Sequence, residues 1–368
     1  MPQNDPDPRE FVNIADFERH ALEVLSAMPR DYYRSGAWDE ITLRANREAW
    51  ERVALWYRVM RDVSRRTTAC EVLGGPSAMP LCVAPTALHR MAHPEGELAT
   101  ARAAAAAGVP MILSSFSSTG LEEVRAAGLA VDPKARHWMQ VYIGTDRGFI
   151  REYAKRIHAA GYEGLVLTVD TPIWGIRERD IRNHFRVPDG MRVVNLERPG
   201  GPTGHTGRGI HESLAWAVDA ALTWRDFEWL RDASPLPVVV KGICRPEDAS
   251  RAVALGAAGV LVSNHGGRQL DGAPATVEAL RPCVEAVAGR VPVLVDGGVR
   301  RGVDLVRARA LGAQAVCVGR PILWGLATAG EAGVARVLEI LRGECDVALA
   351  LCGCTRPDEA TRELLGPG

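Results

Sequence analysis

From Pro80 onward the chain repeats one unit eight times: a short apolar run, then a stretch that favours helix. The runs are too short for helices and lack the strict alternation of half-exposed strands, which indicates parallel strands covered on both faces. They span Leu81–Thr86, Pro110–Ser115, Trp138–Tyr142, Leu165–Asp170, Pro237–Gly242, Val260–His265, Pro292–Gly297 and Ala315–Arg320. Eight strand–helix units favour an α/β fold of the (β/α)8 type, a TIM barrel, over a doubly wound sheet.

The stretches between the runs begin and end with residues that are typical of helix boundaries. Four of them are predicted to be helical: Pro94–Ala107, Arg151–Ala160, Pro246–Leu255 and Arg301–Leu311. Proline opens the first and the third, and glycine directly follows the end of all four. Proline in the first turn and glycine after the last residue are the usual helix boundaries, so these stretches support the barrel.

The first 79 residues precede the barrel and are expected to form an N-terminal helical segment (1–79) packed on the barrel (80–368), within a single domain. Helices are predicted over Phe17–Met28 and Ala45–Val63. A different kind of segment, Val187–Ser213, follows the fourth run and is rich in Gly, Pro and Arg without periodicity. A loop of this length is typical of a lid over a site or of a disordered tract.

Composition excludes several classes of protein. Apolar residues make up 47% and charged residues 24% of the chain, and the formal net charge is −1, so no global field favours nucleic acid or an anionic membrane. No apolar run reaches the length of a membrane span, and the acidic segment Met1–Glu10 does not resemble a signal peptide, so we expect a cytoplasmic protein. The eight cysteines are expected to be structural thiols, because Cys352-Gly353-Cys354 alone is a poor metal motif. We therefore expect no metal site.

Every run of the predicted barrel ends in polar or glycine-rich residues. These ends are Pro85-Thr86-Ala87, Ser114-Ser115, Gln140 with Tyr142, Thr168 with Asp170, Lys241, Ser263 with His265, Asp296-Gly297-Gly298 and Gly319-Arg320. Functional groups of barrel enzymes lie at the C-terminal ends of the strands. Polar residues at one or two strand ends could be explained by the turns that follow them. Polar residues at all eight ends predict an active site at the mouth of the barrel.

The sixth run ends in the most informative of these segments, Val262–Gly272, which presents a histidine, two glycines and an arginine. His265 at a strand end can move a proton near neutral pH, and Asp170 can orient its imidazole. Arg268, three residues on, can bind a carboxylate with two hydrogen bonds, and Arg177 is a second candidate. A base beside an anion clamp predicts a small acidic substrate that loses a proton.

Two glycine-rich turns and one lysine point to a cofactor. In barrels the loops after strands seven and eight often bind a phosphate through backbone N–H groups, which fits Asp296–Arg300 and Gly319-Arg320. Lys241 follows three valines, so it is either a surface side chain or a cation aimed into the mouth. A cation there would face a cofactor, or would form a Schiff base as in barrel aldolases.

Together these motifs resemble the FMN-dependent 2-hydroxy-acid oxidase and dehydrogenase family, which includes glycolate oxidase, lactate oxidase, mandelate dehydrogenase and 4-hydroxymandelate oxidase. The resemblance extends from Asp31-Tyr32-Tyr33 to Gly353-Cys354 and includes Met91–Glu97, Leu167–Pro172, Ser263–Asp271 and Asp296–Gly302. It implies bound FMN, a small 2-hydroxy acid as substrate, O2 as a further partner, and a homo-oligomer, commonly a tetramer.

The resemblance also implies a role for each matching residue. His265 looks like the base, with Asp170 as its partner, and Tyr142 like the hydroxyl that binds the 2-OH of the substrate. The carboxylate clamp would comprise Arg177 and Arg268, helped by Tyr32. Lys241 would lie at the N1/O2 edge of the flavin. The ring contacts would be Pro85, Thr86, Ala87, Ser114, Gln140, Thr168 and Ser263, and the ribityl and phosphate contacts Asp296, Gly297, Gly298, Arg300, Gly319 and Arg320.

Two positions bear on substrate and oxidant. Ala87 is alanine as in the oxidases, whereas the membrane-linked dehydrogenases often have glycine there, which favours O2 as electron acceptor. Phe116 stands where glycolate oxidase has tryptophan, which predicts room for a larger, mandelate-like substrate. The loop 187–213 is polar where membrane-bound relatives carry an apolar segment, so no membrane attachment is expected.

Other functions share parts of this pattern. The same flavin chemistry could act on an amine or a modified peptide, or pass electrons to an acceptor other than O2. A Schiff-base aldolase would use Lys241 instead. A scaffold without turnover has no need of a base beside two anion clamps, so His265, Arg177 and Arg268 argue against it.

Overall fold

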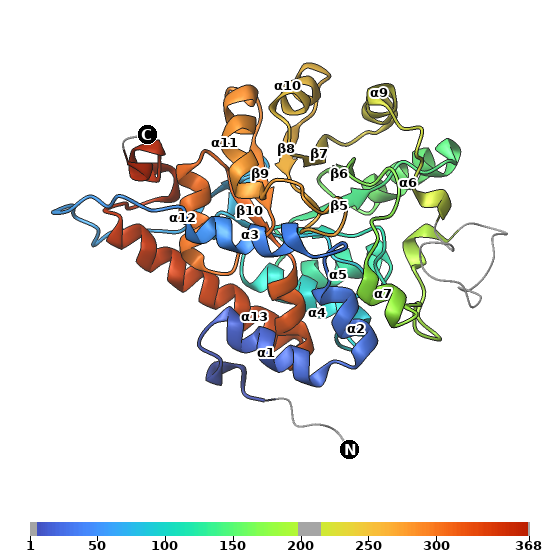
Figure 1. Ribbon diagram of the computed structural model, residues 1–368, viewed down its shortest axis with the longest axis horizontal. Coiled ribbons are helices and arrows are strands. Elements are labelled where there is room, and N and C mark those ends of the chain that lie inside the picture. Colours follow the sequence, from blue (N-terminus) through green and yellow to red (C-terminus); the bar gives the residue numbers. More distant parts are fainter. Residues whose placement is uncertain (1–5, 198–214, 367–368) are drawn as a thin grey trace.

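A computed structural model of the protein describes residues 6–197 and 215–366. Eight parallel strands close into a barrel in the order β10-β3-β4-β5-β6-β7-β8-β9. The strands are β3 (Leu81–Val83), β4 (Met111–Leu113), β5 (His137–Val141), β6 (Leu165–Thr168), β7 (Val238–Ile243), β8 (Gly259–Val262), β9 (Val293–Asp296) and β10 (Ala315–Val318). The strands occupy the centre of the molecule and the helices surround them (Figure 1), which confirms the predicted (β/α)8 barrel.

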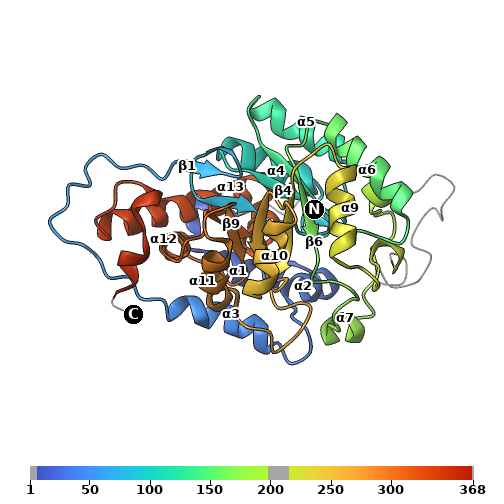
Figure 2. The ribbon, with the colours of Figure 1, turned by 90° about the horizontal axis from the view of Figure 1, so that it is seen from above.

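A helix follows each barrel strand, and from above the helices are seen around the strands (Figure 2). These helices are α4 (Gly96–Ala106), α5 (Leu121–Val131), α6 (Arg147–Ala159), α9 (Trp224–Ala233), α10 (Pro246–Ala254), α11 (Thr276–Val287), α12 (Gly302–Ala310) and α13 (Arg320–Leu351), with the short α7 (Glu178–Arg182) between β6 and α9. All four helices predicted between the runs are present, with boundaries shifted by a few residues. Helix α13 bends at Ala329 and Gly330, whose backbone angles are not helical.

The inside of the barrel is closed at one end by a hairpin. Strands β1 (Cys70–Val72) and β2 (Gly75–Ser77) pair antiparallel, and Val72 and Leu73 pack with the inward-facing side chains of the barrel strands. Arg136, just before β5, donates to the carbonyl oxygens of Val72 and Leu73. Because the hairpin covers the N-terminal end of the strands, the C-terminal end remains as the mouth.

The first predicted helix, over 17–28, is instead two helices, α1 (Ile14–Val24) and α2 (Ala27–Arg34). Pro29 explains the break, because its ring would clash with the carbonyl of a preceding helical turn but is tolerated in a first turn. Helix α2 therefore begins just before Pro29 and includes Tyr32 and Tyr33.

The second predicted helix, over 45–63, is wrong beyond Glu51, where α3 (Ile41–Glu51) ends. After α3 the backbone bonds to the C-terminal segment of the chain. The amides of Trp56, Arg58 and Thr67 donate to the carbonyls of Leu364, Cys352 and Thr355 respectively. These tertiary partners replace the acceptors that a continued helix would have supplied, so the local helical pattern is overridden.

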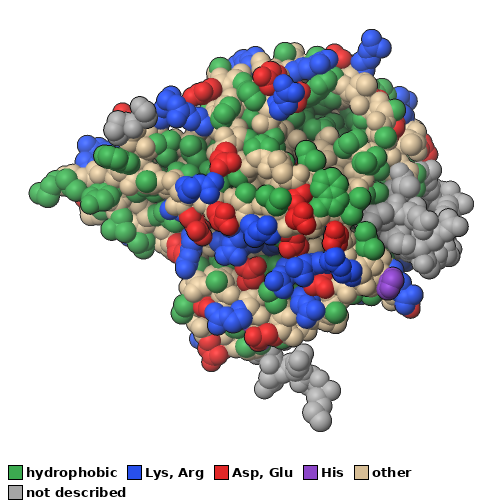
Figure 3. Space-filling view, viewed as in Figure 1, with side chains coloured by type: hydrophobic (Ala, Val, Ile, Leu, Met, Phe, Trp, Pro, Cys, Tyr) green, Lys and Arg blue, Asp and Glu red, His purple; other side chains and the backbone are tan. Residues whose placement is uncertain are grey.

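Few other features of the described residues bear on function. Short 3-10 turns lie at Pro8–Glu10, His89–Met91, Val194–Leu196, Ala215–Ala217, Pro357–Glu359 and Arg362–Leu365. No helix within the described ranges has both the length and the apolar character to cross a membrane. Basic and acidic side chains are interspersed over the face shown in Figure 3. Of the expected lid over 187–213, residues 198–213 lie outside the described residues.

Candidate active site

A cavity with about 1100 Å³ of empty space opens at the C-terminal end of the barrel strands. Almost all of the residues that the sequence singled out line it. They are Tyr32, Pro85, Thr86, Ala87, Ser114, Phe116, Gln140, Tyr142, Thr168, Arg177, Lys241, His265, Arg268, Asp296, Gly297, Gly298, Arg300, Gly319 and Arg320. Asp170 and Ser263 do not line the cavity, and each instead bonds to His265 from behind.

His265 is held on a tight turn after β8. His265, Gly266 and Gly267 have φ angles of +58°, +65° and +75°, in the left-handed region that side chains rarely adopt. A Cβ on Gly267 would lie 2.7 Å from the amide nitrogen of Leu43, so the turn has no room for a larger residue. The His265 amide donates to Ser263 Oγ over 3.1 Å, which anchors the turn. Strain of this kind is typical of functional positions.

Asp170, at the end of β6, fixes the imidazole of His265. Its Oδ1 lies 2.9 Å from His265 Nδ1 and also accepts from the Thr171 hydroxyl. Burial lowers the pKa of His265 to about 4, although Asp170 acts in the opposite direction. Burial raises the pKa of Asp170, but His265 and Lys241 outweigh it and bring the value to about 2. At neutral pH a neutral imidazole, oriented by a carboxylate, therefore presents Nε2 as a proton acceptor.

Two arginines, the buried Arg177 and the half-buried Arg268, lie near the ring of Tyr32. The guanidinium carbon of Arg268 lies 5.1 Å from the ring centroid and that of Arg177 lies 6.0 Å from it. Burial, and after it the charge of Arg177, lowers the pKa of Arg268 to about 10, so both groups remain cations at neutral pH. Asp180 offers only a distant contact to Arg177, at 3.7 Å. The two cations are therefore suited to bind a carboxylate.

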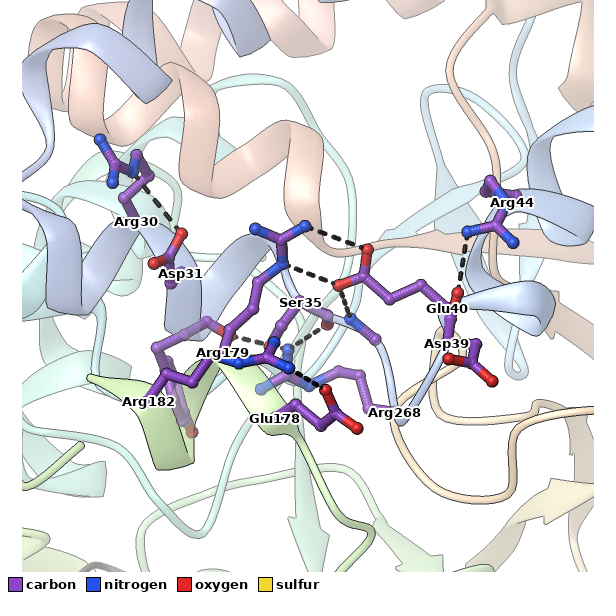
Figure 4. Close-up of polar contacts among 12 residues, drawn as sticks. Arg30, Asp31, Ser35, Asp39, Glu40, Arg44, Glu178, Arg179, Arg182 and Arg268 are labelled. Atoms are coloured by element: carbon purple, nitrogen blue, oxygen red, sulfur yellow. Dashed lines mark hydrogen bonds and ion pairs between the residues drawn. The ribbon is translucent and has the colours of Figure 1, made fainter. Parts of the chain in front are cut away.

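The arginine clamp is tied to the rim of the mouth. Arg268 donates to the backbone oxygens of Tyr32 and Ser35, and its position beside Ser35 is seen in Figure 4. In the same view Arg179 of α7 bonds to Glu40, just before α3. These contacts join α7, the α2–α3 loop and the turn after β8, so they fix the direction of the Arg268 side chain.

One wall of the cavity is aromatic. The ring of Phe116 lies 5.2 Å from that of Tyr142 and 5.6 Å from that of Trp174, between centroids. Burial, and after it the Asp170 carboxylate, raises the pKa of the Tyr142 phenol, so the phenol stays protonated and able to donate. The sequence patterns did not single out Trp174 as a site residue. Its large ring takes up part of the space that was expected beside Phe116.

The floor of the cavity is polar and buried. Lys241 Nζ lies 3.8 Å from Asp296 Oδ2, and both side chains are almost fully enclosed. Burial raises the pKa of Asp296, and Lys241 only partly opposes this. Gln140 accepts from the Ser115 amide and donates to Thr168 Oγ1, which fixes its carboxamide. Lys241 is thus a buried cation aimed into the mouth, not a surface side chain.

Comparison with known proteins identifies the family to which the chain belongs. The model of the FMN-dependent dehydrogenase family matches residues 21–367. The chain belongs to this family. It is 50% identical to L-lactate oxidase from Nostoc sp. (strain PCC 7120) over 348 residues, 94% of this chain and 95% of that one. It is 49% identical to 2-hydroxyacid oxidase 1 of Mus musculus, over 94% and 93% of the two chains. The structure of mandelate oxidase with (S)-2-phenylpropionate matches with a TM-score of 0.86 at 43% identity, over 95% and 97%.

Membership of the FMN-dependent dehydrogenase family makes the protein an FMN-dependent oxidoreductase of the 2-hydroxy-acid oxidase group, as the motifs predicted. The aldolase alternative for Lys241 therefore loses its basis. Within the described residues no cluster of three or more His, Cys, Asp or Glu side chains could hold a metal ion.

The residues present fit the phosphate of FMN. Arg300 and Arg320 are half-buried cations that line the cavity beside the turns after β9 and β10. Burial, and after it the charges of Arg268 and Arg300, lowers the pKa of Arg320 well below its ordinary value, so an anion placed among these groups would be stabilised. Gly298 has φ +80°, and a Cβ on it would lie 2.1 Å from the Asn46 carbonyl oxygen. Only glycine permits this close turn, as expected for a phosphate loop.

The polar groups near the other strand ends fit the flavin ring. Ser114, Gln140 and Thr168 present fixed hydroxyl and amide groups to the cavity, and Lys241 adds a buried cation. Ser263 is the exception among the predicted ring contacts, because it lies beneath the turn of His265 instead of on the cavity surface. Trp174 could have been suspected from the sequence, since it follows Asp170 by four residues in the same loop.

Proposed function

We propose that this enzyme oxidises an (S)-2-hydroxy acid with a medium-sized or aromatic side chain to the 2-oxo acid, with O2 as electron acceptor and H2O2 as second product. One observation supports this most: the neutral His265 imidazole, held by the Asp170 carboxylate, faces the same cavity as Arg177 and Arg268, in a family that binds FMN. A base and a carboxylate clamp at this spacing suit a substrate whose acidic group adjoins the carbon that is oxidised.

Each residue has a defined part in the proposed reaction. Arg177 and Arg268 bind the substrate carboxylate, and Tyr142 donates a hydrogen bond to the 2-hydroxyl group. His265 Nε2 takes one proton from the substrate, and Asp170 stabilises the imidazolium that results. FMN, when bound, accepts the two electrons that leave the substrate. The substrate gives up two electrons and two protons in all, and their transfer to O2 gives H2O2, so the overall reaction is balanced.

The aromatic wall supports the proposed class of side chain. Phe116, Tyr142 and Trp174 form a continuous aromatic surface on one side of the cavity. Aromatic pairs add to apolar burial by about 0.5–1.5 kcal/mol, so an aryl or branched side chain is favoured over the hydrogen atom of glycolate. Solved structures of mandelate oxidase that match this chain contain aromatic ligands such as benzoyl-formic acid.

Two observations support O2 as the acceptor. The curated relatives at 46–50% identity are named oxidases. Ala87, which lines the cavity, is the residue that oxidases carry at this position.

Oxygen uptake tests the proposal. The purified enzyme with FMN is supplied with (S)-mandelate, (S)-lactate and glycolate in an oxygen electrode, and H2O2 is measured with peroxidase. We expect one H2O2 for each O2 consumed, with kcat/KM highest for (S)-mandelate and at least tenfold lower for its (R)-enantiomer. Absence of oxygen uptake with all three acids would contradict the proposed reaction, and glycolate as the best substrate would contradict the proposed side-chain class.

A further inference from the structure

A chain of hydrogen bonds leads from the cavity into the protein behind Thr86. The hydroxyl oxygen of Thr86, which lines the cavity, lies 2.5 Å from His89 Nε2. On the other side of the imidazole, His89 Nδ1 lies 3.0 Å from Thr100 Oγ1. His89 and Thr100 are both fully buried. The proposed reaction uses neither of them, so their arrangement needs a separate explanation.

The proton positions along this chain can be worked out from the contacts. Thr100 Oγ1 donates its only proton to the Gly96 carbonyl within α4, at 3.4 Å. We therefore assign Thr100 Oγ1 as the acceptor of a proton on His89 Nδ1, 3.0 Å away. Burial lowers the pKa of His89, although Glu97 acts in the opposite direction, so the imidazole is neutral and carries one proton. His89 Nε2 is then an acceptor and binds the hydroxyl proton of Thr86.

Glu97 does not require His89 as a counter-ion. Its carboxylate is fully buried and accepts from the His89 and Ser118 amides at 3.0 and 2.8 Å. It also accepts from the hydroxyl groups of Ser118 and Thr119 at 2.7 and 2.9 Å. Glu97 lies in the first turn of α4, where the helix dipole stabilises a negative charge. With four donors and the dipole, the carboxylate is satisfied while His89 stays neutral, and it fixes the backbone of the 89–91 turn.

The Thr86 hydroxyl therefore has a fixed hydrogen-bonding role toward the cavity. Because the proton of Thr86 is committed to His89, only the lone pairs of its oxygen face the cavity. An oxidised flavin ring offers mainly acceptors at its polar edge, whereas the reduced ring gains an N–H donor at N5. A hydroxyl that can only accept therefore favours the reduced cofactor. Freed from His89, the same hydroxyl could rotate and donate to the oxidised ring.

We propose that His89 is a positioning residue that holds Thr86 as a hydrogen-bond acceptor toward FMN and thereby raises the reduction potential of the bound flavin. The inference rests on the proposed contact of Thr86 with FMN. It concerns the reduction potential of the bound cofactor and does not depend on which hydroxy acid is the substrate.

Two substitutions break the chain at different points. His89→Phe removes the acceptor of the Thr86 proton. Thr100→Val removes the acceptor of His89 Nδ1–H with little change of shape, so the imidazole moves its proton to Nε2 and Thr86 turns its own toward the cavity. For each variant we expect the affinity for reduced FMN, relative to oxidised FMN, to fall about tenfold. Tenfold corresponds to a potential lower by about 30 mV for a two-electron couple.

Conservative changes at the same positions are the matched controls. His89→Gln can still accept from Thr86 and donate to Thr100, and Thr100→Ser keeps its hydroxyl, so both should retain the wild-type potential. The potentials are measured on the FMN-loaded proteins by dye equilibration during enzymatic reduction, which needs no hydroxy acid. FMN absorbance and thermal unfolding show that each variant is loaded and folded.

The two loss variants decide the proposal. Lower potentials in His89→Phe and Thr100→Val, with wild-type values in the two controls, would support it. A potential within a few millivolts of wild type, or a higher one, in a folded and loaded Thr100→Val would overturn it. Because the measurement requires no turnover, failure of the proposed oxidase function would appear separately, as a normal potential without substrate oxidation.

Discussion

At the scale of single residues, the site works by keeping groups in the protonation states that the reaction needs. His265 is neutral because it is buried, and Asp170 is ionised because His265 and Lys241 outweigh the cost of its burial. Arg268 remains charged although burial and the charge of Arg177 lower its pKa, and Asp180 lies 3.7 Å from Arg177. A carboxylate substrate bound as proposed would add negative charge here, so its binding would relieve the repulsion between the two arginines.

The base assignment predicts the effect of removing the imidazole. In His265→Gln, FMN should remain bound, because the phosphate turns and floor are unchanged, but the rate of flavin reduction should fall by about 10²–10⁴. Stopped-flow absorbance measures the rate. His158→Gln, on the exposed face of α6, is the control and should behave like the wild type. A His265→Gln enzyme that is reduced at the wild-type rate would rule out His265 as the base.

The lowered pKa of His265 predicts an unusual pH profile. The base must be unprotonated, and an ordinary imidazole would lose activity below about pH 6.5. With a pKa of about 4, His265 stays unprotonated well below that value, so kcat/KM should be level from pH 8 to about 5 and fall as the pH approaches 4. The profile of kcat/KM reports the free enzyme, which is the state described by the structure. A fall in kcat/KM centred near pH 6.5 would show that burial does not lower the pKa of His265.

Trp174 should affect aryl substrates selectively. Trp174→Leu removes one ring of the aromatic wall, so kcat/KM for (S)-mandelate should fall about two- to tenfold, as expected for a lost aromatic contact. Glycolate, which has no side chain to contact the wall, should be unaffected. Trp56→Leu, at an exposed position, is the matched control. An equal fall for both acids would assign Trp174 to general structural support.

At the scale of elements, helix α3 connects the N-terminal segment to the turns of the site. Asn46 and Asn264 exchange two hydrogen bonds of 2.9 Å, and Asn46 Oδ1 also accepts from the Thr276 amide. Trp50 Nε1 donates to the Gly297 carbonyl at 2.8 Å. A helix outside the barrel thus holds the turn that carries His265 and the turn proposed to bind phosphate.

Asn46→Ala should therefore destabilise the protein. The change removes the acceptor of one Asn264 side-chain N–H and of the Thr276 N–H in a buried place, at a cost of about 1–3 kcal/mol each. We expect the free energy of unfolding in urea to fall by about 3 kcal/mol. Arg44→Ala, on the exposed side of the same helix, should change it by less than about 0.5 kcal/mol. A fall in Asn46→Ala no larger than in this control would contradict the role of α3.

At the scale of the whole molecule, the barrel and most of the site could be predicted from the sequence. Parallel strands buried on both faces give apolar runs, and their ends give polar residues, so both signals are local. The extent of α3 could not be predicted, because the acceptors for the amides after Glu51 come from the C-terminal segment. Trp174 escaped notice because only folding brings its ring beside Phe116, and the place of Ser263 depends on the left-handed turn of His265.

The most direct test of the account is the visible spectrum of the FMN-loaded protein, recorded without oxygen before and after addition of (S)-mandelate, (S)-lactate and glycolate, and again after admission of air. We expect flavin bands that bleach with (S)-mandelate and return in air. Flavin bands that no (S)-2-hydroxy acid bleaches would leave the fold and the cofactor in place but contradict the proposed pairing of His265 with the arginine clamp.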